Sequence, residues 1–330
     1  MSVMDFMLDI NITGPEKKIN YEAPVLLMGS CFTEHIGNYL KELKFDILQN
    51  PNGILFDPYS VTNNLVSYIE NKKYTESDLI YLNELWQSWK HHSVFSNTNK
   101  EECLRIINES QSNAHHFLKK TKWLIITLGS SFSYRLVDGN IPVANCHRAP
   151  AQLFNKHLMT IEEIHTALDT CIHRLFQFNP TINIVFTVSP VRHIRDGVVE
   201  NNRSKARLIE CVHHLANKFS NIYYFPAYEL VIDVLRDYRF YDVDMVHPNY
   251  PATEFVLKHF TESYIDEDSK QIMQEVKKIV IAKKHKAFQP ATQAHRKFLQ
   301  TNLDKAKELS DKYPFLNLKE EISYFTNSKG

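Results

Sequence analysis

The chain has 330 residues, of which 43% are hydrophobic, and its 38 basic residues (Lys and Arg) balance 38 acidic ones. This composition is typical of a folded globular protein, and the balanced charge argues against nucleic acid or an anionic membrane as a partner. The longest apolar runs have strand length, the first residues show no signal-peptide pattern, and five scattered cysteines indicate reduced thiols. We therefore expect a cytoplasmic protein without a membrane span.

Five short apolar runs are continuous rather than alternating, which is typical of strands buried in a parallel sheet. They are residues 24–29, 45–49, 122–128, 182–188 and 221–225. Between most of them lie stretches with helical periodicity, at 32–43, 60–70, 98–118, 160–177 and 203–218. This alternation predicts a three-layer α/β/α domain with a five-stranded, mostly parallel sheet, whose strand carboxyl ends form the edge where ligands bind.

Two segments do not fit the alternation of strands and helices. Residues 132–137 and 141–145 flank a turn that contains Gly139, which predicts a β-hairpin on the ligand edge of the sheet. Residues 86–92 carry two tryptophans and two histidines. They could form a platform for a carbohydrate, but the general burial of aromatic side chains favours a packing role.

The last part of the sequence has a different character. After about residue 265 it is rich in Lys and Glu, and residues 272–284 and 293–313 have the spacing of amphipathic helices. We therefore divide the chain into a domain over residues 1–265 and a C-terminal helical extension over residues 266–330, packed on or beside that domain.

Two groups of residues could carry chemistry. The first strand ends in Gly29-Ser30-Cys31 and a helix follows, so the helix N-terminus should lower the pKa of the Cys31 thiol. A cysteine that packs behind the sheet is the equally supported alternative. After the last strand, Asp244 precedes His247 by three positions, so the carboxylate can bind Nδ1 and leave Nε2 free as a base. A solvated loop with an incidental Asp and His is the other interpretation.

A further pair, Arg192 and His193, follows the fourth predicted strand and should lie on the same edge. These side chains could hold an anionic or polar substrate group, or the loop could bond to itself, and the sequence does not separate the two interpretations. Because no His or Cys residues have the spacing of a metal site, we expect no metal, and we expect no other cofactor.

Together these residues resemble the SGNH/GDSL hydrolase superfamily and, within it, the GSCFA family. The motif that names the family is present as Gly29-Ser30-Cys31-Phe32-Thr33, with Thr in place of the final Ala. The resemblance covers roughly residues 20–265 and implies a flavodoxin-like fold of SGNH type. Supporting segments are residues 50–53, 128–131, 145–148 and 187–193.

The resemblance implies a role for each matching residue. It places Cys31 at the nucleophile position, with Ser30 as the alternative nucleophile shifted by one residue. It makes His247 the base and Asp244 the residue that orients it.

The resemblance also implies which groups bind the oxyanion or the substrate. The Gly53 N–H, in the block that also holds Asn52, would donate to the oxyanion together with the Cys31 N–H. In the block that begins with Gly129, the superfamily normally has an asparagine as a further donor. Here that asparagine is missing, and the Ser131 hydroxyl is its substitute.

We therefore expect an acyl or ester hydrolase of SGNH type that acts on a small-molecule or saccharide-linked acyl substrate. One alternative is an acyltransferase that moves an acetyl group to a saccharide, because a thioester intermediate can react with an alcohol as well as with water. The other is a non-catalytic binding or scaffold protein on the same frame. The acyl group, the acceptor and the oligomeric state do not follow from the sequence.

Overall fold

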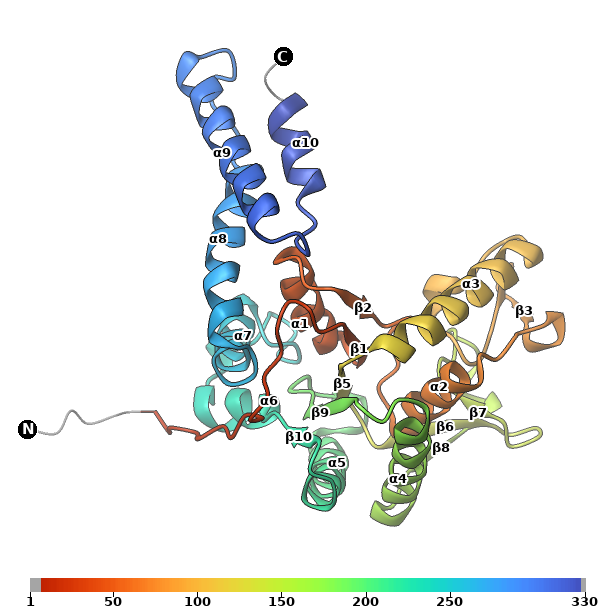
Figure 1. Ribbon diagram of the computed structural model, residues 1–330. Coiled ribbons are helices and arrows are strands. Elements are labelled where there is room, and N and C mark those ends of the chain that lie inside the picture. Colours follow the sequence, from red (N-terminus) through yellow and green to blue (C-terminus); the bar gives the residue numbers. More distant parts are fainter. Residues whose placement is uncertain (1–6, 328–330) are drawn as a thin grey trace, which may run out of the picture.

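The structure is a computed structural model that describes residues 7–327 (Figure 1). Its centre is a five-stranded sheet in which all neighbouring pairs are parallel, in the order β10-β9-β5-β1-β2. The strands are β1 (Val25–Gly29), β2 (Ile47–Gln49), β5 (Trp123–Leu128), β9 (Asn183–Val188) and β10 (Ile222–Tyr224). All five lie in the predicted runs, and the strand order is the flavodoxin-like one, so the predicted fold class is confirmed.

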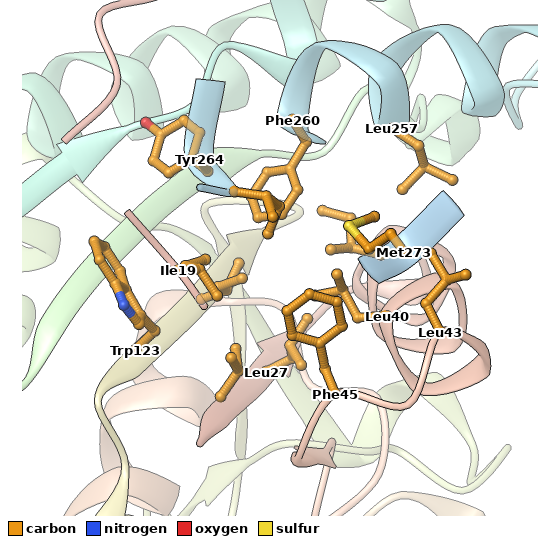
Figure 2. Packing of buried hydrophobic residues seen from close by; sticks show 14 of the residues in the cluster. Ile19, Leu27, Leu40, Leu43, Phe45, Trp123, Leu257, Phe260, Tyr264 and Met273 are labelled. Atoms are coloured by element: carbon orange, nitrogen blue, oxygen red, sulfur yellow. The ribbon is translucent and has the colours of Figure 1, made fainter. Parts of the chain in front are cut away.

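Both faces of this sheet are covered, because successive strand residues point to opposite sides. Val25 and Leu27 of β1 belong to one core cluster, and Leu26 and Met28 belong to the other. The first cluster lies under α1 (Cys31–Glu42), α6 (Ala227–Glu229), α7 (Tyr250–Tyr264) and α8 (Glu267–Lys284). The second lies under α2 (Pro58–Glu70), α3 (Lys100–Lys120), α4 (Ile161–Phe178) and α5 (Val198–Lys218). Figure 2 shows how side chains from β1, α1, α7 and α8 meet in the first cluster.

Two small antiparallel sheets accompany the main one. The predicted hairpin is present as β6 (Phe132–Leu136) and β7 (Pro142–Val143), and a third strand, β8 (Phe154–Leu158), pairs with the free side of β6. Strands β3 (Ile80–Leu82) and β4 (Leu85–Gln87) form the second small sheet. In the neighbouring aromatic segment, His91 is fully buried and packs edge-on against Tyr74, which agrees with the packing role.

The C-terminal helices project from one side of the sheet domain (blue in Figure 1). They are α8, α9 (Gln293–Lys312) and α10 (Lys319–Asn327), of which α10 was not predicted. Helix α8 contributes Met273 and Val276 to the first core cluster, and its Ile279 packs with Leu303 and Phe325 in a separate small core. The extension is therefore docked on the sheet domain, while the division at residue 265 stays a prediction. No helix within residues 7–327 combines the length and the apolar character that a membrane span needs.

A buried carboxylate joins the extension to the sheet domain. Glu321 of α10 is 2% exposed, and its Oε1 accepts hydrogen bonds from Lys44 Nζ at 2.9 Å and from Lys283 Nζ at 3.0 Å. Burial by itself raises the pKa of Glu321, but the two ammonium groups outweigh it and hold the pKa below its usual value. The ionised carboxylate therefore stabilises the docked position of α10.

Replacing Glu321 with Gln should lower the free energy of unfolding by about 2 kcal/mol, because Lys44 loses its charged acceptor and Lys283 loses the buried one of its two. A folded-state pKa below the unfolded one means that this stabilisation is complete above the unfolded value of about 4.3 and is lost as the pH falls through the folded value. Urea unfolding between pH 3 and pH 7 measures both effects. The control is Glu320→Gln, since Glu320 is exposed and a change within about 0.5 kcal/mol is expected. Equal losses in the two variants would contradict the role of Glu321.

Candidate active site

The turn between β1 and α1 is fixed by a glycine that no other residue could replace without strain. Gly29 has φ +134°, and a Cβ at this position would lie 2.1 Å from the carbonyl oxygen of Thr127 in β5. Its N–H donates to Asn50 Oδ1 at 3.0 Å, and the next N–H, of Ser30, donates to Thr127 O at 3.1 Å. The start of α1 is thereby clamped against the carboxyl end of the central strand.

Ser30 and Cys31 have different environments in this turn. Ser30 is 2% exposed and caps α1, since its Oγ accepts a hydrogen bond from the Phe32 N–H at 3.3 Å. Cys31 is the first residue of α1 and is half-buried. The alternative of a cysteine hidden behind the sheet is therefore not what the structure has.

The pKa of the Cys31 thiol is raised, which corrects the expectation that the helix N-terminus lowers it. Burial is the largest cause, and the carboxylate of Glu34 adds to it. The N–H groups of Phe32 and of Cys31 itself, and the charge of Lys205, lower the pKa but do not outweigh these causes. In the resting protein the sulfur therefore carries its proton at neutral pH.

Asp244 and His247 make the contact that their spacing predicts. Asp244 Oδ2 lies 2.6 Å from His247 Nδ1, and Oδ1 accepts hydrogen bonds from the N–H groups of Val246 at 2.9 Å and His247 at 3.0 Å. These hydrogen bonds, with that of the imidazole first, lower the pKa of Asp244 to about 2. The carboxylate is thus ionised at neutral pH, and among residues 7–327 no hydrogen bond engages Nε2 of the half-exposed His247.

One cavity of about 500 Å³ brings the two groups together. Six of the residues singled out from the sequence line it, namely Ser30, Cys31, Arg192, His193, Asp244 and His247. Within residues 7–327 no hydrogen bond joins Cys31 Sγ to His247, although both side chains line this cavity. A proton transfer between them needs the imidazole and the thiol to approach each other.

Arg192 and His193 also line this cavity. The Arg192 guanidinium lies 4.2 Å from the ring centre of Tyr241, and its backbone N–H donates to Val246 O at 3.2 Å, which ties the two loops together. Burial, followed by the charges of Lys205 and His247, lowers the pKa of His193 to about 4. His193 is therefore neutral at physiological pH, and no carboxylate within residues 7–327 forms an ion pair with Arg192.

The loop after β2 does not supply the donors expected from it. The Gly53 N–H donates to Asn50 O at 2.8 Å within a tight turn, so it is not free for an oxyanion. Asn52 is 1% exposed, and its side-chain amide donates to Asn64 Oδ1 of α2. Neither residue lines the cavity, and both expectations are corrected, because the turn engages the Gly53 N–H and α2 engages the Asn52 amide.

The block after β5 is corrected in the same way. The Gly129 N–H donates to Phe56 O at 2.8 Å. Ser131 is fully buried, and its Oγ donates to the carbonyl of Ser204 at 3.1 Å and contacts Ser204 Oγ at 3.0 Å. The residue of this block that lines the cavity is Ser130, which the sequence interpretation did not single out.

The sequence interpretation also missed Lys205 in α5. This side chain is 1% exposed, and its Nζ donates to Gly129 O and to Ser189 O, both at 2.6 Å. Burial lowers the pKa of Lys205 to about 7, and the charge of Cys31 acts in the opposite direction. A signal was present, since Lys205 continues the apolar face of the helix that includes Leu208 and Val212.

The sequence matches the GSCFA family over residues 24–260. The chain belongs to the GSCFA family. This confirms the family suggested by the Gly-Ser-Cys motif, whereas membership of the SGNH/GDSL superfamily stays a prediction. Residues 276–328 match the C-terminal domain of GSCFA domain proteins.

Comparisons with individual proteins add little to the family assignment. No curated protein matches the sequence of this GSCFA chain. Among solved structures, it is similar to a carbohydrate esterase family 3 protein from Talaromyces cellulolyticus, with 8% identity and a TM-score of 0.37. That similarity covers 78% of this chain and 99% of the other. Residues 7–327 contain no group of three or more side chains placed to hold a metal ion.

Replacing Ser131 with Ala should lower the free energy of unfolding by about 1–2 kcal/mol, because two buried hydrogen bonds to Ser204 are lost. Urea unfolding followed by circular dichroism measures the change. Ser220 is exposed, so Ser220→Ala is the control and should change stability by less than about 0.5 kcal/mol. If Ser131→Ala were as stable as the unsubstituted protein, a structural role for this hydroxyl would be excluded.

Proposed function

We propose that this protein is an enzyme of acyl or ester chemistry, built on a site of SGNH type. The observation that carries the proposal is that Cys31 and the Asp244-oriented His247 line one cavity at the carboxyl edge of the sheet. A nucleophile, a base and a residue that orients the base are the parts that covalent acyl transfer requires. The alternative, a binding protein with the same fold, would not need an unoccupied His247 Nε2 and a half-buried Cys31 thiol in one cavity.

The raised pKa of Cys31 decides how the attack proceeds. Because the thiol is protonated at rest, His247 Nε2 takes its proton as the sulfur attacks the carbonyl carbon of the substrate. The imidazolium that forms is stabilised by the Asp244 carboxylate. The site thus uses general-base catalysis, as a serine hydrolase does, rather than a preformed thiolate.

The remaining steps follow from the same groups. The C–O bond of the ester breaks, the leaving alkoxide takes the proton from His247, and the acyl group stays on Cys31 as a thioester. Water or an alcohol then attacks the thioester while His247 accepts its proton, the C–S bond breaks, and that proton returns to the Cys31 sulfur. Since the N–H of Gly53 and the hydroxyl of Ser131 are occupied, the Cys31 N–H at the start of α1 is the donor we assign to the oxyanion.

The substrate should carry a polar or anionic group near its acyl bond. Arg192 lines the cavity, and its guanidinium stacks on the ring of Tyr241. In the described part of the chain, no carboxylate forms an ion pair with it. An anionic group of the substrate would supply that partner. A saccharide that carries an acyl group is one substrate class with the polar surface that such a cavity suits.

Cys31→Ala and His247→Ala should each lower kcat/KM for short acyl esters by about a thousandfold or more, because a nucleophile and its base act together in the same catalytic step. The assay follows the release of nitrophenol from nitrophenyl acetate, alone and with added sugar alcohols. Faster release of nitrophenol with an added sugar alcohol than in water alone would show that the enzyme transfers the acyl group rather than hydrolysing the ester.

Two control variants define the nucleophile. Cys146→Ala removes a half-buried thiol outside the cavity and should leave the activity unchanged. Ser30→Asn removes the hydroxyl but keeps a residue that can cap α1. Activity that persists in both Cys31→Ala and His247→Ala would refute the proposal, and activity lost only in Ser30→Asn would assign the attack to Ser30.

A further inference from the structure

Lys205 is a fully buried lysine at the edge of the sheet where the candidate active site lies. Its Nζ sits between the carbonyl oxygens of Gly129 and Ser189, the residues that follow β5 and β9, at 2.6 Å from each. Strand β5 is the immediate neighbour of β1, whose end carries Cys31. Lys205 therefore lies where three adjacent strands of the parallel sheet end.

A purely structural role does not require a charge at this position. Burying an ammonium group without a carboxylate is costly, and no carboxylate within residues 7–327 forms an ion pair with Lys205. Elsewhere in the chain a neutral side chain performs the same bridging task. The buried amide of Asn179 donates to Leu118 O at 3.0 Å and to Thr121 O at 2.8 Å.

The charge of Lys205 acts on groups that face the cavity. It lowers the pKa of Cys31 against the larger effect of burial and the opposing charge of Glu34. It also lowers the pKa of His193, on which His247, Asp196 and Lys156 act more weakly. In the opposite direction, an ionised Cys31 raises the pKa of Lys205 against the larger effect of burial.

We propose that Lys205 is a positioning residue for the reaction proposed above, in which its ammonium group stabilises the negative charge on Cys31 Sγ. When the S–H bond breaks, the proton goes to His247 Nε2 and the electron pair stays on sulfur, while Lys205 keeps its three protons. The bonds to Gly129 O and Ser189 O hold the ammonium group in place, so it does not have to move during the reaction. This inference rests on the proposed function, but its test does not depend on catalysis.

The test is the rate at which iodoacetamide alkylates Cys31 between pH 6 and pH 10, followed by mass spectrometry of the peptide that contains it. At pH 6 Lys205 is charged, so Lys205→Gln should slow alkylation about tenfold or more. Above pH 9 Lys205 is neutral in the unsubstituted protein, and the two rates should converge. A change that merely loosens the structure would alter the rate at every pH.

The same experiment contains its controls. Cys146 in the same sample, which Lys205 does not influence, should react equally in both proteins. Glu34→Gln should speed the alkylation of Cys31, because it removes the carboxylate that opposes the thiolate. A folded Lys205→Gln whose Cys31 reacts at the unsubstituted rate at pH 6 would overturn the proposal and leave Lys205 as a strand bridge.

The unsubstituted protein gives a second readout if Lys205→Gln does not fold. Its alkylation rate should rise up to about pH 7, level off as Lys205 loses its proton, and rise again when Cys31 ionises by itself. A single uninterrupted rise would contradict the proposal. If Cys31→Ala instead retains full esterase activity, the proposed function fails, while the alkylation profile still decides the role of Lys205.

Discussion

The parallel register of three central strands is the constraint on which the candidate site depends. Gly29 pairs with Thr127, and Thr127 pairs with Thr187, so β1, β5 and β9 end side by side. Each strand then delivers one part of the site: Cys31 follows β1, a carbonyl acceptor for Lys205 follows β5, and His193 follows β9. The loop that carries His247 is tied to this edge by the hydrogen bond between Arg192 N–H and Val246 O.

The burial that stabilises this edge also sets the chemical state of its groups. It raises the pKa of Cys31, and it lowers the pKa of His193 to about 4 and that of Lys205 to about 7. A site of this kind keeps its nucleophile protonated until a base removes the proton, and it makes a nearby positive charge effective because little water screens it. In the proposed mechanism, the exposed Asp244–His247 pair would act as the base and the buried Lys205 would supply the positive charge.

The strands of the sheet and contacts between residues close in sequence could be predicted from the sequence. Contacts between segments distant in sequence could not. The five central strands are buried on both faces, so each shows as a continuous apolar run, whereas β8 has Lys156 and His157 in an exposed strand and no such run. The contact of Asp244 with His247 spans three residues and was predictable. The bonds of Lys205 to Gly129 and Ser189 join distant segments, and the Gly53 turn engages an N–H that the family resemblance had assigned to the oxyanion.

The most direct measurement of the central claim is to trap the acyl-enzyme. The protein is mixed with nitrophenyl acetate at neutral pH, quenched in acid within the first turnover, and analysed by peptide mass spectrometry. The account predicts one acetyl group on Cys31, bound as a thioester that hydroxylamine removes, and none on Cys146 or in Cys31→Ala. Acetyl found on Ser30, or product released without any acetyl on Cys31, would contradict the account.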